Sequence, residues 1–101
     1  MAFRDLAGAA IACTLLGRYA DAVTYAEQSR QRNQQFGVAY RMLAAAYAQL
    51  GETNKAANEL ARYRTLDPDA TITHLKAQLP YKDQEQAERL WAGLRKAGLP
   101  E

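Results

Sequence analysis

Histidine and cysteine are almost absent from this chain, whose 101 residues include only His74 and Cys13. A single cysteine excludes an internal disulfide, and in an apolar stretch it is expected to be a small buried side chain. A lone histidine excludes a zinc site of the usual kind, because such sites need several converging ligands. We therefore expect no disulfide, no metal and no other cofactor.

The motifs of catalysis are also missing. There is no glycine-rich phosphate loop, no dinucleotide-binding turn and no serine elbow. Two pairs of carboxylates, Glu85 with Glu88 and Asp67 with Asp69, lie where helix ends or solvated helix faces are expected. Because no group of residues supplies a nucleophile, a base and an orienting residue together, the sequence predicts a protein that is not an enzyme.

Neither sign of charge dominates, since 13 basic and 11 acidic residues leave a formal net charge of +2. Non-specific binding of nucleic acid needs a concentrated basic stripe. The basic pairs here, Arg30 with Arg32 and Arg62 with Arg64, are interrupted by other residues and have acidic residues nearby. We interpret them as solvated helix faces, so nucleic acid is not an expected partner.

Long hydrophobic runs are absent as well. The apolar stretch near the N-terminus, residues 6–16, is too short to cross a membrane. A secretion signal is disfavoured because Asp5 interrupts a leader in which Arg4 is the only basic residue. We therefore expect no contact with a membrane and a cytoplasmic location.

Alanine-rich segments with helical spacing of apolar residues are what the chain has in abundance. Hydrophobic residues make up 49% of the sequence, and many of them are alanine, the strongest helix former. No segment shows the alternation of apolar and polar residues that is typical of a strand. The predicted fold class is therefore all-α. The expected helices are residues 3–16, 19–33, 37–50, 53–66, 71–79 and 83–97.

Local signals define the final helix. Asp83 followed three residues later by Gln86 resembles a capping box, and Gly98 is placed to end the helix. The single tryptophan, Trp91, could anchor a partner, as tryptophan often does in interfaces. The interpretation that we favour is that Trp91 packs in the core, under Tyr81 or the adjacent turn.

One stretch of the chain carries aromatic, small and apolar residues at fixed offsets, beginning with Tyr-x2-Leu-Ala-x2-Tyr. The positions are Tyr40, Leu43, Ala44, Tyr47, Gly51, Ala56, Leu60 and Pro68. This spacing resembles the signature of the tetratricopeptide repeat family. The resemblance implies antiparallel helix pairs that stack as a short right-handed α-solenoid, the α-α superhelix of that family.

Shifting the chain by 34 residues places Leu16-Gly17 on Leu50-Gly51, where each helix must stop. The expected domain is therefore one unit over residues 1–101. Its parts are a first repeat at about 3–36, a second at about 37–70, and a degenerate repeat with a capping helix at about 71–101. Because repeat arrays usually run longer, we expect the chain to be part of a larger protein.

The resemblance also implies that the first helix of each pair lines a concave groove. The expected function is a scaffold that binds a peptide or a partner protein in this groove. The candidate groove residues are Arg4, Ile11, Leu15, Val38, Arg41, Met42, Ala45, Gln49 and Lys76. Arg41 could pair with a carboxylate, because the planar guanidinium matches that group, so the partner is expected to be acidic. The two-carboxylate clamp of some family members is not reproduced.

The C-terminal third resembles the tail of bacterial signalling proteins that combine a class III nucleotide cyclase domain with tetratricopeptide repeats. The motifs are Leu66-Asp67-Pro68, Leu79-Pro80-Tyr81-Lys82-Asp83 and the closing residues 94–101. The resemblance implies an appendage of an upstream catalytic domain. An alternative function is thus regulation or homo-oligomerisation, with a homodimer formed through the exposed N-terminal end at Phe3, Leu6 and Ala10.

Overall fold

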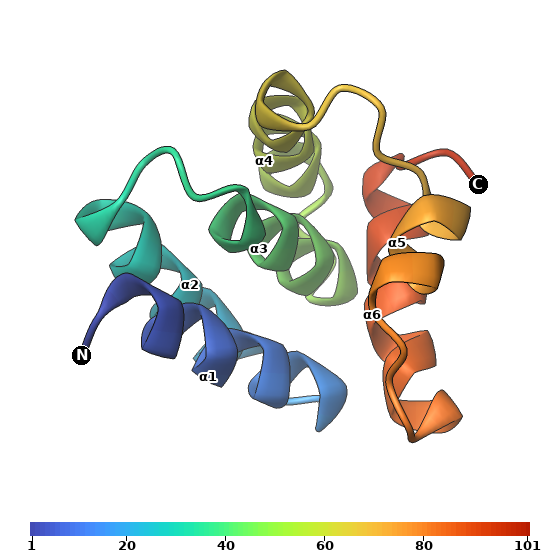
Figure 1. Ribbon diagram of the computed structural model, residues 1–101, viewed down its shortest axis with the longest axis horizontal. Helices are drawn as coiled ribbons and strands as arrows, with labels where there is room; N and C mark the ends of the chain where they lie inside the picture. Colours follow the sequence, from blue (N-terminus) through green and yellow to red (C-terminus); the bar gives the residue numbers. More distant parts are fainter.

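The computed structural model describes residues 1–101 and contains α-helices connected by short turns, without strands (Figure 1). The prediction of an all-α fold is confirmed, and each expected range contains the helix that is observed. The helices are α1 (Phe3–Leu15), α2 (Tyr19–Arg32), α3 (Gly37–Gln49), α4 (Thr53–Leu66), α5 (Ile72–Gln78) and α6 (Gln84–Ala97).

The first four helices form two similar hairpins, α1 with α2 and α3 with α4, and α3 packs against both α1 and α2. Each hairpin turns at a glycine with positive φ, 79° at Gly17 and 81° at Gly51. Side chains other than glycine rarely adopt this conformation. After Gly51 the Glu52 N–H donates to the Tyr47 carbonyl at 2.8 Å, and the equivalent bond after Gly17 has the same length. The two hairpins therefore close in the same way, as the shift of 34 residues predicts.

Residues 71–101, the C-terminal unit, pair α5 with α6 and with the end of the chain. Asp83 begins α6 by accepting a hydrogen bond from the Gln86 N–H at 3.1 Å, and Gly98 ends it at φ 112°. The closing residues then return to α5, where the Ile72 N–H donates to the Pro100 carbonyl at 2.9 Å. The backbone of α5 approaches that of α6 and of no other helix.

Helix α6 crosses three other helices, α1, α3 and α4 (Figure 1). In its first half, the Arg89 Nη1 atom donates to the Leu15 carbonyl at 2.7 Å. Its middle contacts α3, and beyond its end Gly98 lies beside Leu60 of α4. The first helices of the two hairpins, α1 and α3, are thus bridged by a helix from the other end of the chain.

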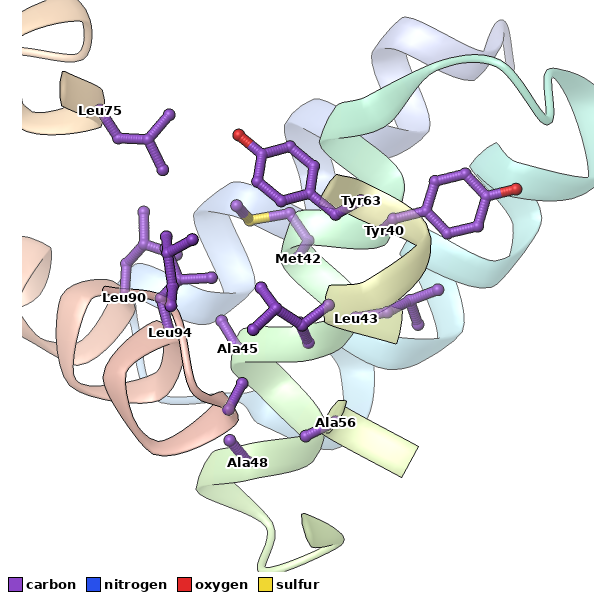
Figure 2. Close-up of a cluster of buried hydrophobic side chains, with 14 of the residues drawn as sticks. Tyr40, Met42, Leu43, Ala45, Ala48, Ala56, Tyr63, Leu75, Leu90 and Leu94 are labelled. Atoms are coloured by element: carbon purple, nitrogen blue, oxygen red, sulfur yellow. The ribbon is translucent and has the colours of Figure 1, made fainter. Parts of the chain in front are cut away.

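The core lies where α6 meets α3. Met42, Leu43, Leu90 and Leu94 are fully buried, and Figure 2 shows Met42 and Ala45 on the side of α3 that faces Leu90 and Leu94 of α6. Burying each such leucine or methionine contributes roughly 1.5–3 kcal/mol relative to exposing it. Most of the larger apolar side chains of α6 are therefore part of the common core.

The crossing of α6 over α3 requires a residue without a side chain. A Cβ atom at position 93 would lie 2.6 Å from the carbonyl oxygen of Ala45, which is closer than real Cβ contacts. Gly93 and the small Ala45 together let the two backbones come this near. Elsewhere a helical glycine costs stability relative to alanine, so its presence at position 93 has a packing reason.

Gly93→Ala is expected to lower the free energy of unfolding by about 1–3 kcal/mol, because α6 must move away from α3. Gly8→Ala is the matched control, since Gly8 is also helical but a Cβ atom added to it would meet no packed neighbour within 4 Å. It should raise stability by about 0.5–1 kcal/mol through the better helix propensity of alanine. Urea denaturation followed by circular dichroism measures both. Equal effects of the two substitutions would contradict the close crossing.

Candidate functional site

The inner face of the hairpins is the side of α1 and α3 that the sequence assigns to a groove, and α6 covers its C-terminal half. Met42 and Ala45 are completely buried and therefore do not line an open groove. This corrects the expectation for these two residues. The physical reason is that the apolar side chains of α6 fill the space that a partner was expected to occupy. Such packing joins distant parts of the chain and has no local signal in the sequence.

Two further candidates, Leu15 and Gln49, are engaged with α6 through hydrogen bonds. The Leu15 carbonyl accepts from Arg89, and the Gln49 Nε2 atom donates to the Arg89 carbonyl at 2.8 Å. The Gln49 Oε1 atom accepts from Lys96 Nζ at 2.7 Å. Both residues therefore help to position α6 in this structure.

The remaining candidates on α1 and α3 make no hydrogen bond with α6. Arg4 is exposed, and Ile11 and Val38 are half-buried. Together with Arg41, most of which is covered, they make up the part of the inner face that we call the open inner face. Lys76 does not belong to it: Lys76 lines a pocket of about 290 Å³ whose walls come from α5, α6 and the intervening loop, with no residue of α1 or α3.

Arg41 has an unusual environment for a cation. It is only 8% exposed, and its Nε atom is buried without a hydrogen-bond partner. None of the ion pairs of the chain includes Arg41, so no carboxylate oxygen lies within 4.0 Å of its guanidinium nitrogens. Its Cζ atom lies 5.7 Å from the centroid of the Tyr63 ring, an arrangement that gives a cation–π attraction. Arg41 is thus a largely desolvated positive charge without a counter-ion.

Two tyrosines report the position of this charge. Burial raises the pKa of Tyr63 and of Tyr81 above the usual value. A side-chain hydrogen bond with Arg41, and then its positive charge, oppose that rise at Tyr63, and the positive charge alone opposes it at Tyr81. The Tyr63 hydroxyl donates to Asp67 Oδ2 at 3.0 Å. Since Tyr63 lies on α4 and Tyr81 in the C-terminal unit, Arg41 is placed where α3, α4 and this unit meet.

The N-terminal end offers less free surface than the sequence suggested. Leu6 and Ala10 are buried within the chain, and the Phe3 ring packs edge-on against Phe36 with centroids 4.9 Å apart. The Phe3 carbonyl also accepts a hydrogen bond from Ser29 at 2.7 Å. The expectation that Leu6 and Ala10 contact a second copy is corrected because both side chains are buried, while a homodimer through the N-terminal end stays a prediction.

The structure also shows the burial of Trp91 and Cys13, two other residues whose burial the sequence predicts. The interpretation of Trp91 as a core residue is confirmed, because it is buried and its ring centroid is 6.0 Å from that of Tyr81. Cys13, expected to be buried, is only half-buried. No group of three or more histidine, cysteine or acidic residues could hold a metal ion. No helix combines the length and the apolar character needed to cross a membrane.

The outer side, formed by α2 and α4, carries charged contacts that sequence reasoning missed. Arg30 Nη1 donates to both oxygens of Glu59, at 2.8 and 2.9 Å. The Tyr47 hydroxyl donates to Glu27 Oε1 at 2.6 Å. These pairs join residues 29 and 20 positions apart, so no local pattern could have identified them. Burial, and then the bond to Glu27, raise the pKa of Tyr47 to about 12.

Comparison with known proteins supports the repeat interpretation. Residues 15–79, well over half of the chain, match the model of a protein family described as tetratricopeptide repeat. The matched segment extends from the end of α1 to just beyond the end of α5. No curated protein and no solved structure matches the chain.

The raised pKa of Tyr47 predicts a loss of stability at alkaline pH. The neutral phenol is favoured in the folded state, so this contribution is complete below pH 10 and disappears as the pH rises towards 12. In Tyr47→Phe the free energy of unfolding should fall less steeply over this interval. Denaturation at a series of pH values tests the slope, and absorbance at alkaline pH tests the loss of one late-titrating tyrosine. An unchanged slope in the variant would contradict the assignment.

Proposed function

We propose that this chain, which belongs to the tetratricopeptide repeat family, is a protein-interaction module whose open inner face binds an acidic segment of a partner protein. The family supports the role of scaffold. The surface and the acidic partner are inferred from the residues of the open inner face, Arg4, Ile11, Val38 and Arg41. No reaction is involved, and recognition depends on a preformed arrangement of helices.

The observation that carries the proposal is the uncompensated charge of Arg41. A buried cation without a counter-ion is costly, and an incoming carboxylate would relieve that cost while making hydrogen bonds to the guanidinium, whose Nε atom has no partner. Arg41 is the only residue with a buried side-chain nitrogen or oxygen that lacks a partner. A partner carboxylate is therefore the group that this surface most lacks.

The packing of α6 on α1 and α3 supports the choice of the open inner face as the binding surface. The C-terminal halves of α1 and α3 already accept an amphipathic helix from the chain itself, with Leu90 and Leu94 fully buried. A partner segment beside α6 would contact Ile11 and Val38 with its apolar residues and present an acidic residue to Arg41. Arg4, which is exposed, would add long-range attraction for the same charge.

The finer expectations stay predictions. These are a cytoplasmic bacterial signalling protein as the parent, an upstream class III cyclase-type domain, and a role as a regulatory or oligomerisation appendage of that domain. They rest on the closing motifs of the sequence and not on the open inner face.

A peptide-display selection against the immobilised chain tests the proposal. The wild-type chain is expected to enrich peptides with an acidic residue at a fixed place beside apolar residues. Arg41→Met should lose that enrichment, because it removes the charge while keeping a long apolar side chain. The variant should fold, since replacing a buried charge with an apolar group is often neutral. Circular dichroism checks this.

Arg18→Met is the matched control, because Arg18 is exposed and lies in the turn between α1 and α2, away from the open inner face. It should select the same peptides as the wild-type chain. The proposal fails if the folded Arg41→Met variant enriches the same acidic peptides, or if Arg18→Met loses them equally.

A further inference from the structure

A second recessed surface lies on the outer side of the molecule, away from the open inner face. It is a pocket of about 470 Å³ between α2, α4 and the beginning of α3. The lining residues, which we call the outer pocket, are Arg30, Gln31, Gln34, Tyr40 and Arg62. None of them is acidic, and four of the five side chains can donate hydrogen bonds through a guanidinium or an amide.

Arg30 is held in place but keeps free donors. Its side chain is 24% exposed, and its Cζ atom lies 5.8 Å from the centroid of the Tyr40 ring. Both of its hydrogen bonds to Glu59 come from Nη1 alone. The Nε and Nη2 atoms therefore have no protein partner, and neither is among the buried atoms left unsatisfied, so both reach solvent.

Arg62 supplies a second guanidinium from the neighbouring helix. Its side chain is 62% exposed, and its closest carboxylate oxygen, on Glu59, is 3.9 Å away, beyond hydrogen-bond distance. Glu59 is only 11% exposed and does not line the pocket. Arg30, Arg62 and Glu59 together carry a net charge of +1. The two arginines are the more exposed residues, and the Glu59 carboxylate lies behind them.

We propose that the outer pocket binds a phosphomonoester group. Two guanidinium groups from different helices, with two amides beside them, offer more donors than the two oxygens of one carboxylate can accept. A phosphomonoester has three terminal oxygens in a tetrahedral arrangement and a charge near −2, so it can pair with both guanidinium groups at once. The group can belong to a phosphorylated side chain of a protein or to a small phosphorylated metabolite. The pocket is separate from the open inner face, so both can be occupied together.

The test is a titration of the full chain followed by NMR spectroscopy, with Ac-Gly-phosphoserine-Gly-amide and AMP as probes. The unphosphorylated peptide and adenosine serve as references. Saturable shifts are expected at Gln31, Gln34 and Tyr40 with the phosphorylated probes alone. Tighter binding of the peptide identifies a phosphorylated protein as the source, and tighter binding of AMP identifies a small metabolite.

Two variants and one control give the test its specificity. Arg62→Gln should weaken binding about tenfold, the loss expected for one charge-assisted contact. Arg30→Lys keeps a cation beside Glu59 but loses the free Nε and Nη2 donors, and it should weaken binding similarly. Arg64→Gln makes the same charge change on the same helix outside the pocket, and it should change affinity less than about twofold.

Equal weakening by Arg64→Gln and Arg62→Gln would overturn the proposal, because binding would then depend on overall charge alone. Shifts confined to residues outside the outer pocket would overturn it as well. The result is independent of the partner-binding proposal, since Arg41→Met should leave phosphate binding unchanged.

Discussion

The close crossing of α6 over α3 is the contact on which the rest of this structure depends. Because Gly93 has no side chain, the backbone of α6 can approach the Ala45 carbonyl, and Leu90 and Leu94 can enter the core between the hairpins and the C-terminal unit. The same contact determines which part of the inner face remains open. It also places Tyr81 of the C-terminal unit near enough to Arg41 for the positive charge of Arg41 to oppose the rise in the pKa of Tyr81.

The two hairpins and the C-terminal unit have different sources of stability. The hairpins repeat the same turn at Gly17 and Gly51 and pack as neighbours in sequence. The C-terminal unit is joined internally by backbone hydrogen bonds from α5 to Pro100 and Glu101. Its attachment to the hairpins depends on α6, because the backbone of α5 approaches no other helix. A substitution that weakens the packing of α6 on α3 is therefore expected to loosen the whole C-terminal unit from the inner face.

Local chemistry made much of the fold predictable from the sequence. Gly17, Gly51 and Gly98 mark helix ends through their positive φ, and Asp83 begins α6 as the capping pattern predicts. The position of α6 was not predictable, because Ala45 and Gly93 are far apart in the chain and neither residue type marks a crossing by itself. For the same reason the sequence places Met42 and Ala45 in an open groove, although both are buried. It identifies Arg41 as a candidate binding residue but gives no sign that Arg41 is buried. The Arg30–Glu59 pair joins two helices and left no local signal.

The nuclear Overhauser effect between the Ala45 methyl group and the Gly93 α-protons is the most direct measurement of the arrangement. A crossing at this point predicts a strong signal, because a Cβ placed on Gly93 would be 3.1 Å from the Ala45 Cα atom. Absence of this signal, with Gly93 contacting only residues of α4, would mean that α6 packs against α4 instead of crossing α3. The inner face would then be open along its length, contrary to the structure described.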